Sequence, residues 1–200
     1  MAFHYEGDFN LKKVEVGQMG NNCYILIDPA TGEALVIDAA WEPDRILKEV
    51  DGLKVQRILT THGHHDHHDA LDPVRQALKV PGGIGADDAG MLKTPPDFTI
   101  KEGDTFRFGN HELRALHTPG HTPGSTCFLI GKHLFTGDTL FPGGPGNTKG
   151  DPQRFAEIIE SVRSRLFTLP EDTVVYPGHG ADTTIGTEKP HLEEWIERGW

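Results

Sequence analysis

Histidine and aspartate are concentrated in one short run of the sequence, Thr60-Thr61-His62-Gly63-His64-His65-Asp66-His67-His68. Imidazole nitrogens and carboxylate oxygens are the ligands that zinc and similar cations prefer in proteins. The chain contains 12 histidines, so clustering by chance is the competing explanation. The alternating pattern His62-x-His64-x-Asp66-His67 predicts half of a metal site.

Three later segments repeat the arrangement of a turn or a short strand with a potential ligand. His121 is bracketed by turn residues, Asp138 comes just past a short apolar strand, and His179 follows a strand and a turn. Loops at strand ends carry reactive groups in α/β folds, because the sheet is rigid and the loop can orient side chains. Four separate strand ends that each offer histidine or aspartate make chance a poor explanation.

This series of residues resembles the metallo-β-lactamase superfamily, and the segments around His121, Asp138 and His179 resemble glyoxalase II most. The resemblance implies an α/β fold, a four-layer αββα sandwich, formed as a single domain over residues 1–200. It also implies a binuclear metal site at one edge, between the two sheets. The ligands implied are His62, His64 and His121 for the first metal, Asp66, His67 and His179 for the second, and Asp138 as the bridge.

The elements that must position these residues are indicated by apolar patterns and turn residues. Strands are expected over 11–16, 23–27, 34–37 and 55–60, with hairpins over 105–116 and 125–136. Helices are expected over 43–50, over 72–78 with Asp72 as its cap, from Asp151-Pro152 onwards, and after Pro190. Residues 81–104 give no clear pattern, and Gly83–Asp88 misses the dinucleotide fingerprint because Asp88 stands at its third glycine.

Composition excludes several classes of function. The 19 Lys and Arg against 30 Asp and Glu give a net charge of −11, so we expect no nucleic-acid partner. Met1 to Glu6 shows no signal peptide, and no apolar run approaches membrane-spanning length. We therefore expect a cytoplasmic enzyme with a small-molecule substrate and no membrane partner. Cys23 and Cys127 are expected to be buried free thiols. The sequence does not predict an oligomeric state.

The chemistry expected is hydrolysis. A metal pair about 3.5–4 Å apart can hold a bridging hydroxide at neutral pH. That hydroxide would cleave a thioester such as a 2-hydroxyacyl-glutathione or a related thiol conjugate. Asp66 and Asp138 are the expected catalytic residues, the first orienting the hydroxide and the second bridging. Two Zn²⁺ ions are expected, with Fe²⁺ or a mixed pair as the alternative.

The segment after the bridging aspartate, 141–150, is rich in glycine and by resemblance contacts the substrate. In glyoxalase II it brings a basic residue to the glutathione carboxylate, and here Asn147 stands near that position with Lys149 following. Glyoxalase II also has a helical C-terminal lobe, for which the chain beyond His179 is too short. We therefore expect a more open pocket, in which a different thiol carrier is possible.

Three other functions remain open at this point. A persulfide dioxygenase would use one iron on His62, His121 and Asp138. A lactonase or other ester hydrolase of the superfamily is a further alternative, and a metal-binding module without activity is the third. Aspartate at the bridging position argues against the β-lactam branch, in which cysteine is common there. Among the remaining histidines, His65 and His68 are expected to lie behind the ligands or on the surface, and the role of His117 stays undecided.

Overall fold

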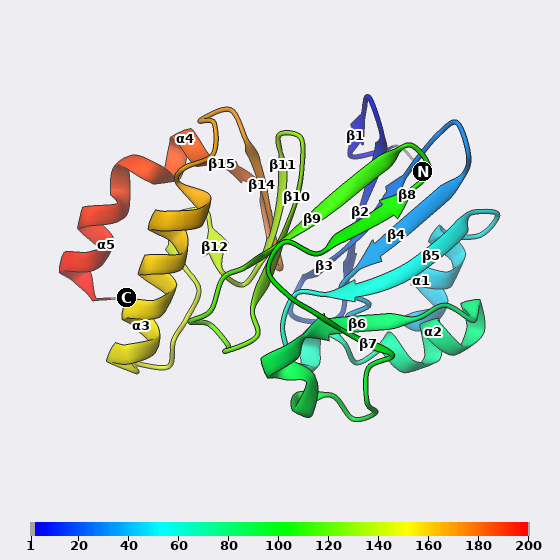
Figure 1. Ribbon diagram of the computed structural model, residues 1–200, viewed down its shortest axis with the longest axis horizontal. Helices are drawn as coiled ribbons and strands as arrows, with labels where there is room; N and C mark the ends of the chain where they lie inside the picture. The colour runs from blue at the N-terminus through cyan, green and yellow to red at the C-terminus, as the bar shows by residue number, and fades with distance from the viewer. Residues whose placement is uncertain (1–2, 200) are drawn as a thin grey trace.

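The computed structural model describes residues 3–199, and two facing β-sheets form its centre (Figure 1). Met1, Ala2 and Trp200 lie outside the described residues. The first two belong to the segment Met1 to Glu6, in which no signal peptide was expected. The first sheet follows chain order, and its strands β4 to β7 are parallel neighbours. Its strands are β1 (Tyr5–Glu6), β2 (Asn10–Val16), β3 (Asn21–Ile27), β4 (Glu33–Ile37), β5 (Lys54–Thr60), β6 (Gly82–Gly85) and β7 (Phe98–Ile100).

The second sheet has the strand order β15-β14-β11-β10-β9-β8, and β11 and β14 are parallel neighbours. Its strands are β8 (Thr105–Phe108), β9 (His111–His117), β10 (Thr126–Ile130), β11 (His133–Gly137), β14 (Val174–Pro177) and β15 (Thr183–Thr184). A small hairpin of β12 (Leu140–Phe141) and β13 (Gly144–Pro145) follows β11. The predicted hairpins over 105–116 and 125–136 are confirmed.

Helices cover the outer face of each sheet (Figure 1). The first sheet carries α1 (Pro43–Glu49) and α2 (Leu71–Leu78), and the second carries α3 (Pro152–Ser161) and α5 (Leu192–Arg198). Helix α3 continues into one π-helical segment, η3 (Val162–Leu166), while α4 (Ile185–Glu188) and the short 3₁₀ helix η4 (Lys189–His191) lead into α5. The helix predicted from Asp151-Pro152 onwards is confirmed, and Asp151 caps it by accepting hydrogen bonds from the backbone N–H groups of Gln153 and Arg154.

Three apolar clusters fill the spaces between these layers. On β3, Tyr24 and Leu26 pack between the two sheets, whereas Cys23 and Ile25 face α1 and α2. This alternation has the period of two that a strand covered on both faces requires. The third cluster, with Trp195 of α5, lies beyond the second sheet. The layers are therefore helix, sheet, sheet and helix, so the four-layer αββα fold is confirmed.

Two details differ from the prediction. Helix α2 begins at Leu71 with Ala70 as its N-cap, and the Asp72 carboxylate pairs with Arg75 in place of capping. The glycine-rich segment contains β6, β7 and the 3₁₀ helix η2 (Ala86–Met91). Glycine is needed in β6 because a Cβ on Gly83 would lie 2.2 Å from Cε2 of Phe98. A strand built largely of glycine shows no hydrophobic alternation, so its pattern is invisible in the sequence.

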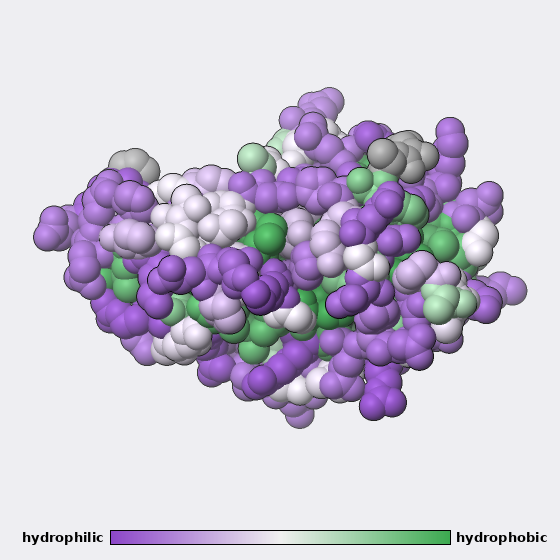
Figure 2. All heavy atoms as spheres, turned by 90° about the horizontal axis from the view of Figure 1, so that it is seen from above, coloured by the Kyte–Doolittle hydropathy of each residue, from purple (hydrophilic) through white to green (hydrophobic). Residues whose placement is uncertain are grey.

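One face of the molecule is mostly hydrophilic (Figure 2), and both cysteines are buried. Hydrophilic side chains cover most of the face shown in Figure 2, with smaller hydrophobic groups between them. Within residues 3–199, no helix is long and apolar enough to cross a membrane. Cys23 and Cys127 are buried and unpaired, as predicted, and burial raises the pKa of the Cys127 thiol to about 11.

Candidate metal centre

The predicted ligands converge because their strands end at the same edge of the two sheets. The run from His62 to His67 follows β5 and includes the short 3₁₀ helix η1 (His65–His67). Asp138 and His179 follow β11 and β14, which are parallel neighbours, so their carboxyl ends meet. His121 lies in the loop between β9 and β10 of the same sheet. All seven predicted ligands are thereby brought together.

The first group consists of His62, His64 and His121. The distance from His62 Nε2 to His64 Nδ1 is 3.1 Å, and His64 Nδ1 lies 2.8 Å from His121 Nε2. One hydrogen on His64 Nδ1 can serve only one of these neighbours, so hydrogen bonding alone does not explain three nitrogens pointing at each other. Burial, followed by the neighbouring imidazoles, lowers the pKa of His121 to about 3 and the pKa of His62 well below its usual value. The rings are therefore neutral, as metal ligands must be.

The second group consists of Asp66, His67 and His179. The distance between the Nε2 atoms of His67 and His179 is 3.1 Å, and Asp66 Oδ2 lies 3.4 Å from His179 Nε2 and 3.5 Å from His67 Nε2. Burial opposes a charge on His67, but Asp38, Asp138 and Asp66 outweigh it and raise the pKa of His67 to about 9. The negative charge that raises this pKa is what a bound cation would neutralise.

Asp138 faces both groups. Its Oδ1 lies 3.4 Å from His67 Nε2, and its Oδ2 lies 3.6 Å from Nε2 of both His121 and His179. Oδ1 is buried and has no hydrogen-bond partner, although burying an unpaired carboxylate oxygen is costly. Burial raises the pKa of this carboxyl group. A carboxylate with one buried, unpaired oxygen, and with its other oxygen facing one imidazole of each group, fits a bridge between two cations.

The second nitrogen of the His67, His121 and His179 rings is held by a neighbouring group, and these neighbours were not predicted. His67 Nδ1 lies 2.9 Å from Oδ2 of Asp38. Oδ2 also accepts a hydrogen bond from the hydroxyl of Thr61, and Oδ1 accepts one from the backbone N–H of Thr61. The backbone oxygens of Asn147 and Met19 lie 2.9 Å and 3.1 Å from Nδ1 of His121 and His179. Such partners fix the tautomer, so that the other nitrogen points its lone pair at the metal.

A further supporting residue, Asn21, holds the acidic ligand Asp66. Asn21 is fully buried, and its Nδ2 donates to Oδ2 and to the backbone oxygen of Asp66, both at 3.0 Å. Asp38 could have been found in the sequence, because it follows the buried strand 34–37 as Asp138 follows β11. Asn21 carries no comparable signal.

Comparison with known proteins is consistent with this geometry. The family model described as the metallo-beta-lactamase superfamily matches residues 16–179. The chain belongs to the metallo-β-lactamase superfamily. It is a metal-dependent hydrolase of this superfamily, as its relatives and its clustered ligands indicate.

Two curated relatives and two solved structures illustrate the similarity. The chain is 30% identical to hydroxyacylglutathione hydrolase GloC of Haemophilus influenzae, over 90% of this chain and 95% of the relative. It is 34% identical to the probable polyketide biosynthesis zinc-dependent hydrolase BaeB of Bacillus velezensis, over 86% of this chain and 78% of the relative. ETHE1 from Myxococcus xanthus has a TM-score of 0.84 and 30% identity, covering 94% of this chain and 89% of that one. TTHA1623 in a di-iron-bound form has a TM-score of 0.74 and 31% identity, covering 88% and 96%.

In this superfamily member the predicted substrate residues lie in the loop beside His121. Asn147 and Lys149 are exposed, and the side-chain oxygen of Asn147 accepts a hydrogen bond from the backbone N–H of Lys149 at 2.6 Å. Burial, followed by the positive charge of Lys149, lowers the pKa of His64. The positive charge of Lys149 therefore acts on one imidazole of the first group. Contact of either residue with substrate stays a prediction.

The histidines outside the ligand set have other surroundings. His65 is exposed, with its ring 5.8 Å from that of Trp41. His68 is buried, and its Nε2 lies 3.2 Å from the backbone oxygen of Gly63. His117 is half-buried, and its Nε2 lies 2.9 Å from the backbone oxygen of Pro123. None of these three belongs to the ligand groups found within residues 3–199.

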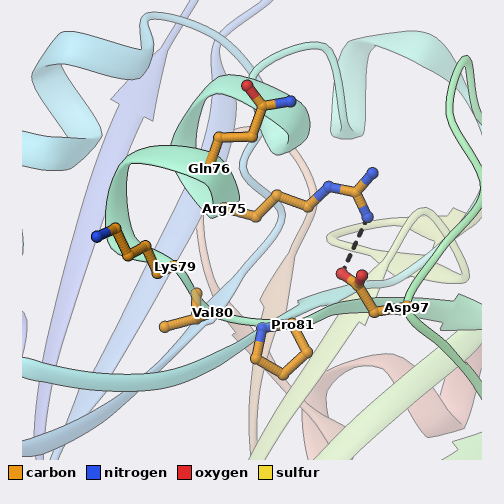
Figure 3. A pocket seen from close by; sticks show the side chains of 6 residues that line it. All are labelled: Arg75, Gln76, Lys79, Val80, Pro81 and Asp97. Atoms are coloured by element: carbon orange, nitrogen blue, oxygen red, sulfur yellow. Dashed lines mark hydrogen bonds and ion pairs between the residues drawn. The ribbon is translucent and has the colours of Figure 1, made fainter.

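Two cavities differ in what they offer this hydrolase. One of about 440 Å³ lies at the end of α2, between the turn that follows this helix and Asp97 (Figure 3), and Arg75 in its lining is already paired with Asp97 and Asp72. The other, of about 690 Å³, is lined by Gly17, Gln18, Met19, Trp41, Glu42 and His65. It adjoins the metal centre, because the backbone oxygen of Met19 contacts His179 and His65 precedes Asp66.

Proposed function

We propose that this chain hydrolyses a thioester, such as a 2-hydroxyacyl-glutathione or a related thiol conjugate, with two zinc ions. The observation that carries the proposal is the position of Asp138, whose Oδ2 lies 3.6 Å from Nε2 of His121 in the first group and from Nε2 of His179 in the second. The similarity to a hydroxyacylglutathione hydrolase supports the substrate class. The similarity to a zinc-dependent hydrolase supports the metal, whereas a di-iron relative keeps the iron pair as the alternative.

Zinc bound in these groups supplies a Lewis acid for the substrate carbonyl and activates water at neutral pH. Asp66 is held by Asn21, so its carboxylate is fixed where it can orient the attacking water. Asp138 faces His67 with Oδ1 and both His121 and His179 with Oδ2, so its carboxylate would contribute to both groups. Cys23 and Cys127 are fully buried, which removes both thiols as nucleophiles. The leaving thiolate needs no dedicated general acid, because a thiolate is already a good leaving group.

The two sides of the centre suit different parts of such a substrate. The positive charge of Lys149 acts on His64 and would attract a carboxylate of the thiol carrier. The cavity with Met19 and Trp41 offers apolar surface, while Glu42 at its lining would repel a carboxylate. We therefore propose that the thiol carrier lies beside Lys149 and the acyl group towards Met19.

The test is a thioester assay on protein loaded with zinc, using S-lactoylglutathione. We expect hydrolysis that disappears with chelator and in Asp138→Ala, and that returns when zinc is restored to the wild type. An exposed substitution far from the ligand loops, Lys132→Ala, should leave the rate unchanged. Absence of thioester cleavage by the zinc-loaded protein would refute the proposed substrate.

The second candidate is a persulfide dioxygenase with one iron on His62, His121 and Asp138. The similarity to ETHE1 fits this alternative. An oxygen-electrode assay with glutathione persulfide, run beside the thioester assay on iron-loaded protein, separates the two. Oxygen uptake without thioester cleavage would favour the dioxygenase, and thioester cleavage without oxygen uptake would favour the hydrolase.

A further inference from the structure

Asp88 is a fully buried carboxylate that lies outside the ligand set. It belongs to η2, in the glycine-rich segment between β6 and β7 (Figure 1), and 0% of its surface is exposed. All three groups that contact its oxygens are uncharged hydrogen-bond donors. Its Oδ2 accepts from the backbone N–H of Gly63 at 2.8 Å and from the hydroxyl of Thr122 at 2.5 Å. Its Oδ1 accepts from the backbone N–H of Gly124 at 2.8 Å.

These three donors belong to two different loops of the metal centre. Gly63 separates His62 from His64, and Thr122 and Gly124 follow His121. One carboxylate therefore ties together the loops that carry all three imidazoles of the first group. Because His64 Nδ1 must lie close to His121 Nε2, a shift between these loops would open that group directly.

The backbone segments around Gly85, Asp88 and Gly124 are packed closely against each other. A Cβ on Gly85 would lie 2.0 Å from the backbone oxygen of Gly124, and a Cβ on Gly124 would lie 2.6 Å from the backbone nitrogen of Asp88. Neither position has room for a side chain. The close approach brings the Asp88 carboxylate within reach of both loops.

The second group is held by other residues. Asn21 holds Asp66, Asp38 holds His67, and the backbone oxygen of Met19 contacts His179. No hydrogen bond from these three ligands to Asp88 is present in the described part of the chain. Loss of the Asp88 contacts should therefore act on the first group selectively.

We propose that Asp88 is a positioning residue that sets the geometry of the His62–His64–His121 group by joining its two loops. It touches no metal ligand side chain and acts through the backbone on either side of them. The inference rests on the metal centre and not on the thioester substrate, so it is independent of which substrate is hydrolysed.

The test measures zinc affinity at each group separately, by competition with a chromogenic chelator. His179→Ala leaves the three-histidine group complete, and His121→Ala leaves the Asp66–His67–His179 group complete. In the first background Asp88→Asn should weaken zinc binding about 10–100-fold, the usual cost of losing a partner that orients a metal ligand. In the second background the affinity should change by less than about threefold. Asp87→Asn removes the same charge from the exposed neighbouring residue and should leave both affinities unchanged.

Two outcomes would overturn the proposal. Equal weakening of both groups by Asp88→Asn would mean that the residue only supports the fold, and no weakening of the first group would mean that the loops are held without it. Thr122→Val removes one of the three hydrogen bonds, and it carries the same test if Asp88→Asn does not fold. A His179→Ala protein that binds no zinc would refute the three-histidine group itself. Cobalt-substituted protein gives a second readout, because the visible spectrum of the three-histidine group should change in Asp88→Asn and stay the same in Asp87→Asn.

Discussion

Replacing Asp38 with asparagine should weaken metal binding at both ligand groups through a change of tautomer. Oδ2 of Asp38 lies 2.9 Å from His67 Nδ1 and accepts from the hydroxyl of Thr61 at 2.8 Å, and Oδ1 accepts from the backbone N–H of Thr61. Thr61 Oγ1 in turn lies 3.1 Å from His62 Nδ1. A carboxylate accepts at both oxygens, so it keeps the ring hydrogens of His67 and His62 on Nδ1 and leaves Nε2 free for a metal.

An asparagine side chain has only one oxygen, so one of these acceptor positions must become an N–H donor. If the amide nitrogen faces His67, it donates to Nδ1 and moves the ring hydrogen to Nε2, which blocks the metal-binding atom. If it faces the backbone N–H of Thr61, two buried donors meet, at a cost of about 1–3 kcal/mol. Either arrangement predicts a loss of about 10–100-fold in zinc affinity, which corresponds to about 1.4–2.8 kcal/mol.

Zinc competition titrations on Asp38→Asn and wild type measure this loss directly. Asp28→Asn is the matched control, because Asp28 is also buried and accepts three hydrogen bonds, from Ala30 and Asn110, away from the ligand loops. Unchanged zinc affinity in Asp38→Asn would refute the tautomer argument. Equal losses in Asp38→Asn and Asp28→Asn would show that any neutralised buried carboxylate has this effect.

Three further predictions concern substrate, pH and partners. Lys149→Ala should raise KM for S-lactoylglutathione about two- to fivefold with little change in kcat. The same substitution should leave the kinetics of an N-acetylcysteamine thioester, which has no carboxylates, unchanged. Equal effects on both substrates would contradict a role of Lys149 in binding the carboxylate. Zinc titrations between about pH 5 and 8 should show that the Asp66–His67–His179 group loses zinc first as the pH falls. Protons compete with zinc for His67 at a higher pH than for His121, because the pKa of His67 is raised to about 9 and the pKa of His121 is lowered to about 3. Loss from the three-histidine group first would reverse this order. Gel shifts with RNA and DNA should show no binding, because the net charge of −11 repels phosphates; a salt-sensitive shift would contradict this.

The convergence of the seven predicted ligand residues was predictable because each follows a strand that shows its apolar character in the sequence. The partners of those ligands were less visible, since a hydrogen bond between Asp88 and Gly63 depends on packing that brings segments distant in sequence together. Gly83 illustrates the same limit in the fold, because its reason for being glycine is the ring of Phe98 on the next strand. The N-terminus of α2 was misplaced because Asp72 resembles a cap, although its carboxylate is used by Arg75. Asp38 is the exception, since it repeats the strand-then-acid pattern of Asp138.

The metal content of the chain, measured together with that of Asp138→Ala, tests the central claim most directly. Elemental analysis of protein purified without chelator should find two zinc ions per chain, one for each group that Asp138 faces. Asp138→Ala should lower the occupancy of both groups together, because its two oxygens serve both. A single tightly bound iron in the wild type, or loss of only one metal from Asp138→Ala, would contradict the bridged pair.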